Sequence, residues 1–140
     1  MVTAVDTNVL VALWSPADEL NERARAGLYG ARARGGLVIV AAVYAELLSA
    51  PHRTEAFIDT FCAEAGIAVD WNIREGVWRA AGRAFQQYSR RRQRHGHGAP
   101  RRILADFLIG AHALQNGFRL LTLDDRVYSA AFPRLPVVTI

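Results

Sequence analysis

The sequence predicts an α/β protein with a central parallel sheet of about five strands and helices on both of its faces. Short apolar segments rich in β-branched residues alternate with longer segments whose apolar side chains recur at helical spacing. The short segments are apolar throughout, as expected for strands that a parallel sheet buries on both faces. No internal repeat or linker divides the chain, so we expect residues 1–140 to form one domain.

Proline and glycine set the limits of the expected elements. A first strand leads into two helices, which Pro16 separates and Gly35 ends. After the second strand come a helix closed by Pro51 and a helix that stops at Gly66, just before the third strand. The longest helix follows, then a loop at 93–100, a helix, the fourth strand, a short helix and the fifth strand. The expected strands are 2–5, 37–40, 67–71, 119–122 and 136–140. The expected helices are 8–14, 18–34, 42–50, 53–65, 73–92, 102–116 and 125–131.

The composition is that of a globular protein, with 51% hydrophobic and 21% charged residues. The longest apolar run, 37–45, is much shorter than the roughly 20 residues that a membrane-spanning helix needs. The first residues lack the basic stretch and apolar core of a signal peptide. Cys62 is the only cysteine, so no intrachain disulfide is possible. We therefore expect a cytoplasmic protein without a membrane partner.

Cys62 and the large aromatic side chains are expected in the core. Cys62 has apolar neighbours, which favours a packing role over a nucleophilic one. His112 is expected to face a neighbouring helix. The aromatic residues assigned to the core are Trp14, Trp71, Trp78, Phe57, Phe61 and Phe85.

Four carboxylates lie where expected elements begin or end, each beside apolar sequence that makes an uncompensated charge costly. They are Asp6, Glu46, Asp106 and Asp124. Ligands of parallel sheets bind beyond the carboxyl ends of the strands, near the point where strand order reverses. Asp6, Glu46 and Asp124 follow the first, second and fourth strands, whereas Asp106 reaches that edge only if its helix begins there. Carboxylates brought together in this way repel one another and attract a divalent cation, which predicts a metal-dependent enzyme.

Each carboxylate also has a purely structural interpretation. Asp6 and Asp124 stand where they can cap the helices that follow them. Glu46 can be a solvated helix residue, and Asp106 can be a first-turn acid favoured by the helix dipole. The metal-site hypothesis rests on all four residues acting together.

One segment carries the whole positive excess of the chain. Residues 90–102 contain six arginines and no acid, whereas the rest has eleven arginines and thirteen acids. Guanidinium groups bind phosphate through a planar fork, so this segment is a candidate RNA-binding surface. The alternative is a solvated helix end and a loop, and the glycines beside His95 and His97 argue against a metal site there. The candidate RNA-binding residues are Arg90, Arg91, Arg92, Arg94, Arg101 and Arg102.

The chain resembles the PIN-domain ribonucleases, and most closely the VapC-type toxins of type II toxin–antitoxin systems. Four segments carry the resemblance, in order and over nearly the whole chain. They are Val5-Asp6-Thr7-Asn8-Val9-Leu10, Tyr44-Ala45-Glu46-Leu47, residues 104–113 (LADFLIGAHA) and residues 120–128 (LLTLDDRVY). One of these segments alone would be weak evidence for the family, but four of them in the same order are specific evidence.

The resemblance implies a PIN-like fold and endonucleolytic cleavage of RNA with bound Mg²⁺ or Mn²⁺. By matching position, Asp6, Glu46, Asp106 and Asp124 take the catalytic roles, with Asp6, Asp106 and Asp124 as metal ligands. The residues given supporting roles are Asn8, Thr122 and Asp125, of which Asp125 is an outer partner or a helix cap. The products implied are 5′-phosphate and 3′-hydroxyl ends. The partners implied are an RNA substrate, a cognate antitoxin protein and a second copy of the chain.

Three functions are compatible with these features. The leading hypothesis is a Mg²⁺-dependent endoribonuclease toxin held inactive by an antitoxin. The second is a PIN-fold nuclease that works in RNA processing without an antitoxin. The third is a non-catalytic PIN-fold module that binds RNA or protein, which the complete acidic set disfavours.

Overall fold

The computed structural model describes residues 1–94, 96 and 104–140, and Arg101, Arg102, His95 and His97 lie outside them. The predicted α/β class is confirmed, and all five strands occur within a few residues of their expected places. The strands are β1 (Thr3–Val5), β2 (Leu37–Val40), β3 (Ile67–Asp70), β4 (Arg119–Thr122) and β5 (Val137–Thr139). The helices are α1 (Thr7–Leu13), α2 (Asn21–Arg34), α3 (Ala41–Leu47), α4 (Glu55–Ala65), α5 (Glu75–Arg94), α6 (Leu104–Gln115) and α7 (Arg126–Ala131).

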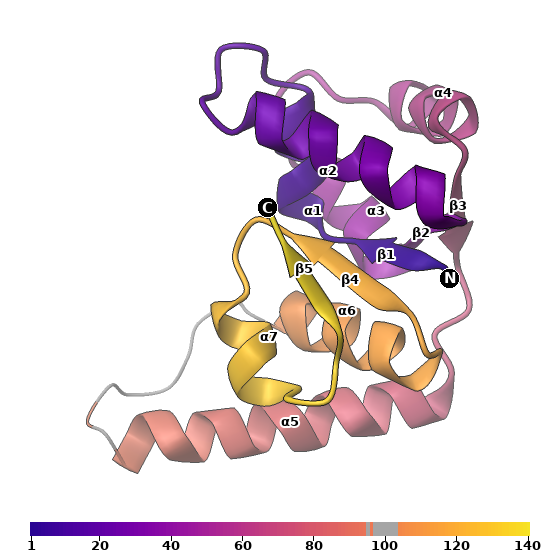
Figure 1. Cartoon of the computed structure of the whole chain (residues 1–140). Helices are drawn as coiled ribbons and strands as arrows, with labels where there is room; N and C mark the ends of the chain where they lie inside the picture. Colours follow the sequence, from indigo (N-terminus) through magenta and orange to yellow (C-terminus); the bar gives the residue numbers. More distant parts are fainter. Residues whose placement is uncertain (95, 97–103) are drawn as a thin grey trace.

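The five strands form one parallel sheet in the order β3-β2-β1-β4-β5. The chain first builds outward from β1 through β2 to β3 and then returns to the other side of β1 with β4 and β5 (Figure 1). Strand order therefore reverses between β1 and β4, where Val5 is the register partner of Leu121. The segments that follow these two strands flank the crevice in which parallel sheets bind ligands.

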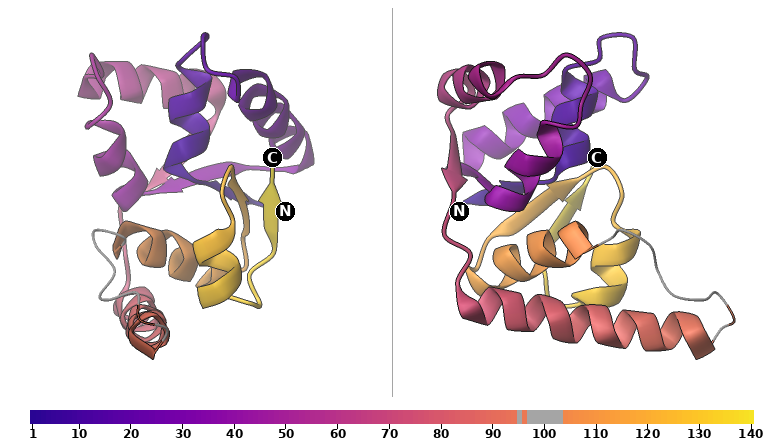
Figure 2. Two further views of the ribbon diagram at one scale, coloured as in Figure 1. Left: turned by 90° about the vertical axis from the view of Figure 1, so that its left-hand side faces the viewer. Right: turned by 180° about the vertical axis from the view of Figure 1, so that it is seen from behind.

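Helices cover both faces of the sheet, as expected. In Figure 1, α1, α2 and α4 lie above the sheet and α5, α6 and α7 below it, and Figure 2 shows the same layers from two further sides. The helix α6 lies between the sheet and the long helix α5, against which it packs extensively. Its first turn reaches the edge of the sheet at which β1 and β4 end.

The central strands are enclosed. Every residue of β1 and β2 is buried, and Ile39 and Leu120 are fully removed from solvent. Gly110 allows α6 to lie directly against the ring of Phe132, because a Cβ atom at this position would collide with that ring. The burial of Leu, Ile and Val side chains makes the main favourable contribution to the folding free energy of such a domain.

Helix ends follow local chemistry. The side chain of Thr54 accepts a hydrogen bond from the backbone N–H of Phe57 at 3.1 Å and caps α4. The same helix ends at Gly66, whose φ of 71° is readily adopted only by glycine. The expected helix 18–34 begins only at Asn21, because Asp18 instead accepts the N–H of Leu20 in a turn.

Several core assignments were wrong. Trp71 is 62% exposed and Trp78 is 49% exposed, and Phe57 is also largely exposed. Trp71 directly follows the edge strand β3, where the sheet has no further neighbour to cover it. Apolar residue type alone does not separate these positions from the true core, since much of any protein surface is apolar. Cys62 is buried, as predicted.

His112 was predicted to face a neighbouring helix, but its polar contact is with a strand. Its Nε2 atom lies 2.8 Å from Oδ2 of Asp70, the last residue of β3. Its ring makes an edge contact with Phe118.

Among the helices that the structure describes, none is long and apolar enough to pass through a membrane.

Candidate active site

Asp6 lies at the end of β1, at the point where strand order reverses. It caps α1: the carboxylate Oδ1 accepts the backbone N–H of Thr7 at 2.7 Å. Its Oδ2 accepts the hydroxyls of Thr122 at 2.8 Å and of Tyr128 at 3.0 Å. The side chain is 5% exposed. Asp6 is thus a helix cap, as its structural interpretation predicted. A cap alone, however, needs neither the burial of this carboxylate nor the two further hydrogen bonds from Thr122 and Tyr128.

Burial raises the pKa of Asp6 above its ordinary value, and the negative charge of Glu46 acts in the same direction. The hydrogen bonds from Thr122, Tyr128 and Thr7 oppose this effect, because they stabilise the ionised form. Three donors on one buried carboxylate indicate a charge that the fold is built to hold in a fixed orientation.

Thr122 connects the ends of β1 and β4. Its hydroxyl is completely buried and contacts Asp6, and it accepts the backbone N–H of Asp124 at 3.1 Å. Asn8 completes the link, since its side-chain nitrogen lies 3.3 Å from the Thr122 hydroxyl and its oxygen accepts the N–H of Leu123 at 3.2 Å. The structure therefore places Asn8 and Thr122 beside Asp6, where the sequence pattern put them.

Glu46 reaches the same region from α3. Its Oε1 accepts the hydroxyl of Thr7 at 2.6 Å, and the side chain is half-buried rather than solvated. Thr7 thus contacts both neighbouring carboxylates, with its N–H on Asp6 and its hydroxyl on Glu46.

Asp106 lies in the first turn of α6, and that turn faces the cluster as the sequence argument required. Burial raises its pKa to about 6, and the negative charges of Asp6, Glu46 and, more weakly, Asp124 add to this effect. The mutual repulsion shows that carboxylates from β1, α3 and α6 share one neighbourhood, although more than 30 residues separate each from the next in the chain.

Asp124 takes a different position at the rim. Its carboxylate is exposed and forms a bidentate ion pair with Arg126, with contacts of 2.6 Å to Nη2 and 2.9 Å to Nε. This pairing holds the pKa of Asp124 below its ordinary value. Its Oδ1 also accepts the N–H of Arg126, the first residue of α7, although the N-cap residue of that helix is Asp125, whose side chain makes no capping hydrogen bond. Asp125 turns away from the cluster and accepts the hydroxyl of Thr139 at 3.1 Å.

The donor set fits a hard divalent cation, since carboxylate oxygens are the ligands that Mg²⁺ and Mn²⁺ prefer. Burial, and after it the negative charges of Asp6 and Glu46, raise the pKa of Asp106, so a cation beside these carboxylates would favour their ionised forms. Among the residues that the structure describes, no three acidic, histidine or cysteine side chains are already drawn together as ligands. Protein donors instead engage Asp6, Glu46 and Asp124 separately, through Thr7, Thr122, Tyr128 and Arg126.

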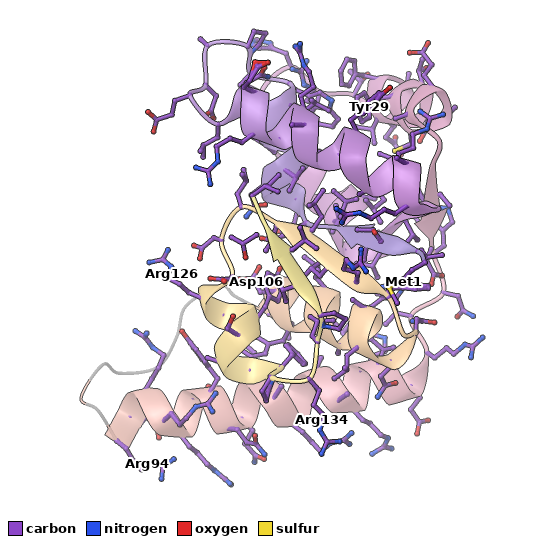
Figure 3. The ribbon with its side chains drawn as sticks, in the orientation of Figure 1. Met1, Tyr29, Arg94, Asp106, Arg126 and Arg134 are labelled. Carbon is purple, nitrogen blue, oxygen red and sulfur yellow. The ribbon has the colours of Figure 1, made fainter. Side chains whose placement is uncertain are left out.

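An open cleft of about 560 Å³ runs beside the carboxylates, along α1 and the start of α7. Its lining includes Asn8, Val11, Leu123, Asp124 and Arg126. Figure 3 shows Arg126 pointing outward from the start of α7. The cleft also includes Asp18 in its lining, whereas Asp6, Glu46 and Asp106 are not among its lining residues. It therefore adjoins the carboxylate cluster through Asn8 and Asp124, with the basic side chain of Arg126 beside them.

The arginines of α5 lie farther away, at the end of the helix that extends past α7 (Figures 1 and 3). Arg90 and Arg94 are exposed and line an open hollow with Gln87, Arg91 and Gln93. Arg91 donates to the backbone oxygen of Ala130, and Arg92 lies over the ring of Tyr88. The structure therefore groups four of the six predicted arginines on one helix end.

Tyr128 was not recognised from the sequence as a site residue. It is 2% exposed, and its hydroxyl contacts Asp6. The available signal was its hydroxyl on the otherwise apolar side of a short helix, because a buried tyrosine hydroxyl needs a polar partner. Nothing local in the sequence identifies that partner.

Comparison with known proteins agrees with this geometry. Residues 3–133 match the PIN domain, and the chain belongs to the PIN domain family. No curated protein matches the chain in sequence.

Several solved structures share the fold over nearly the whole chain, and the predicted likeness to VapC-type proteins is confirmed at this level. VapBC2 of Rickettsia felis, bound to a promoter DNA fragment, is 16% identical with a TM-score of 0.69, covering 100% of this chain and 99% of that one. A toxin–antitoxin complex of Klebsiella pneumoniae is 20% identical with a TM-score of 0.66, covering 98% and 96%. VapC20 of Mycobacterium tuberculosis, a toxin that cleaves the sarcin–ricin loop, is 15% identical with a TM-score of 0.63, covering 93% and 95%.

Proposed function

We propose that this protein is a divalent-metal-dependent endoribonuclease and the toxin of a toxin–antitoxin pair. The observation that carries the proposal is the convergence of Asp6, Glu46 and Asp106 on one partly buried site, where burial and then the charges of Asp6 and Glu46 raise the pKa of Asp106 to about 6. A fold rarely retains such a destabilising arrangement unless a cation or a reaction uses it.

In this proposal Asp6, Asp106 and Asp124 hold Mg²⁺ or Mn²⁺, and Thr122 and Asn8 keep Asp6 in place. The bound ion supplies activation of a water molecule and neutralisation of the charge that develops on the phosphate. Asp125 has no direct role, because its carboxylate is engaged with Thr139 on the other side of the β4–α7 turn.

Glu46 is the residue best placed to accept a proton from the attacking water. The Thr7 hydroxyl binds its Oε1 and thereby orients the carboxylate, while among the residues that the structure describes no protein donor binds Oε2. Attack of water on phosphorus with cleavage of the bond to O3′ leaves a 5′-phosphate on one fragment. The departing O3′ takes up a proton and becomes the 3′-hydroxyl of the other.

The RNA strand would enter the cleft beside α1, with Arg126 at its rim. Because Arg126 already binds a carboxylate through two nitrogens, its fork has the geometry that also suits a phosphate. The arginines at the end of α5 extend this basic surface to Arg90 and Arg94, and Arg101 and Arg102 would add to it. Single-stranded or loop regions suit the site, since a duplex presents its phosphates on a stiffer, wider surface.

The toxin role rests on the fold that the chain shares with toxin–antitoxin structures, and it calls for an antitoxin partner. An apolar groove of about 220 Å³ between α2 and α4 offers that partner a docking surface, and Tyr29 beside it is 80% exposed. Its lining includes Leu13, Leu28, Tyr29, Phe61, Arg25 and Arg32. The two arginines favour an amphipathic antitoxin helix with acidic residues at its margins. We further propose a homodimer in the cytoplasm.

The nuclease proposal is tested with Asp6→Asn, which keeps the shape of the side chain and removes its charge. We expect loss of Mn²⁺-dependent cleavage of a single-stranded RNA with an unchanged circular dichroism spectrum. Asp59→Asn is the matched control, because Asp59 also accepts a tyrosine hydroxyl but lies on α4, away from the site. RNA cleaved equally well by the Asp6 variant and by the unaltered protein would refute the site.

The toxin role is tested separately by co-expression with the product of any small adjacent gene. A toxin is expected to arrest growth when expressed alone and to form a stable complex when the partner is present. A Tyr29→Glu exchange should weaken that complex without affecting RNA cleavage. A nuclease that is active but harmless to its host would favour a role in RNA processing.

A further inference from the structure

The hydroxyl of Tyr128 is buried at the centre of the carboxylate cluster. It reaches this point from α7 and lies 3.0 Å from Oδ2 of Asp6, and its presence near Asp106 lowers the pKa of that carboxyl, against the larger raising effect of burial. The phenol ring itself is enclosed in the core. A polar atom in such an enclosed position is retained only where its hydrogen bonds offset the cost of burial.

The hydrogen bonds to Asp6 leave little freedom to its carboxylate. A carboxylate offers about four lone-pair positions, two on each oxygen. Thr122 and Tyr128 occupy both positions on Oδ2, and the N–H of Thr7 occupies one on Oδ1. The remaining lone pair of Oδ1 is therefore the one that Asp6 can offer to a cation without breaking a protein hydrogen bond.

A tyrosine hydroxyl has a single proton and can donate to only one carboxylate at a time. The structure gives that proton to Oδ2 of Asp6, at 3.0 Å. The hydroxyl oxygen retains lone pairs that can accept a hydrogen bond from another donor, so Tyr128 can keep its contact with Asp6 whatever else binds beside it.

We infer that Tyr128 is a positioning residue for the metal, holding Oδ2 of Asp6 so that Oδ1 faces the cation. This inference rests on the proposed function and names a residue that the four-carboxylate pattern does not contain. Tyr128 contacts a ligand rather than the reacting atoms, so it acts through Asp6. Loss of such an outer partner reduces metal affinity or activity by about 10- to 100-fold.

The test is Tyr128→Phe, which removes one oxygen atom and keeps the ring that fills the core. The variant is expected to fold, because Thr122 still donates to Oδ2 of Asp6 and no buried acceptor is left without a partner. We expect calorimetry to show Mn²⁺ bound about 10- to 100-fold more weakly than by the unaltered protein. We also expect RNA cleavage to recover at high Mn²⁺ concentration, because affinity rather than chemistry is lost.

Tyr44→Phe is the matched control. Tyr44 is also a buried tyrosine whose hydroxyl donates to a carboxylate, Asp59, at 2.8 Å. Its loss should lower the melting temperature without changing Mn²⁺ affinity. A Tyr128→Phe protein that binds Mn²⁺ as tightly as the unaltered protein would overturn the positioning role while leaving the nuclease proposal intact. Failure of the unaltered protein to bind Mn²⁺ would instead overturn the proposed function itself.

Discussion

Replacing Asp106 by Asn should abolish cleavage and at the same time stabilise the metal-free protein. In the metal-free site, Asp106 is a half-buried carboxylate facing the charges of Asp6 and Glu46. Asn keeps the volume and the hydrogen-bonding capacity of the side chain but removes its charge. The same substitution would normally be expected to weaken a helix N-terminus slightly, because an acid in the first turn of α6 interacts favourably with the helix dipole.

The magnitude follows from the pKa. Raising the pKa of a carboxyl group from 3.8 to about 6 corresponds to about 3 kcal/mol between its protonated and ionised forms. Asp106 remains partly accessible, so solvent screening reduces the expected cost of its charge to roughly 1–2 kcal/mol. For a chain of this length, that free energy corresponds to a rise in melting temperature of roughly 3–6 °C.

The effect depends on pH in a defined direction. Between pH 3.8 and about 6 the folded protein binds the Asp106 proton more tightly than the unfolded chain does. Stability contributed by this group is therefore fully present at low pH and is lost as pH rises through about 6. The Asp106→Asn protein should be more stable than the unaltered protein at pH 7.5 and nearly equal to it only below pH 3.8, where the group is protonated in both the folded and the unfolded chain.

The assay is urea unfolding with EDTA present, at pH 7.5 and at about pH 3.5. Asp124→Asn is the control, because Arg126 lowers the pKa of Asp124 and removal of that exposed charge should be neutral or slightly destabilising. Equal stability of the Asp106 variant and the unaltered protein at pH 7.5 would refute the repulsion argument. So would a gain of the same size at about pH 3.5.

Further predictions concern the metal, the arginines and the packing of α6. Saturating Mn²⁺ should raise the melting temperature at pH 7.5. This rise should become smaller below about pH 6, because protons compete with the metal for Asp106. A rise that is independent of pH would exclude Asp106 as a ligand. Exchange of Arg90 and Arg94 for Gln should reduce the slope of log affinity for single-stranded RNA against log salt by about 1.4, and an unchanged slope would remove them from the interface. Gly110→Ala should lower the free energy of unfolding by about 1–3 kcal/mol in urea titrations, because the new methyl group meets the ring of Phe132; an unaffected midpoint would mean that the ring moves aside at little cost.

Much of the fold was predictable because its signals are local. The β-branched runs, helical spacings and glycine stops each reside within a few residues, and β2 and β4 were located to the residue. The parallel sheet followed from the alternation of these segments. The exposure of Trp71 and Trp78 was not predictable, because it depends on which elements cover them, and that is set by strand order.

In the candidate site, too, some features were predictable from the sequence and others were not. The acidic positions and their hydroxyl and amide neighbours stand in short motifs, so Asp6, Asn8 and Thr122 were assigned correctly to one neighbourhood. The motif could not show that Asp124 pairs with Arg126 while Asp6 is buried, because that difference arises from distances across the fold.

By itself, the sequence determined which residue types stand at the carboxyl ends of the strands and that α/β elements carry them. Only the tertiary structure decided that α6 begins at the same edge, that Asp106 therefore feels the charges of Asp6 and Glu46, and that Tyr128 returns from α7 to bind Asp6. The physical reason is range: hydrogen bonds and Coulomb forces act over a few ångströms in space, whereas sequence patterns report on neighbours along the chain.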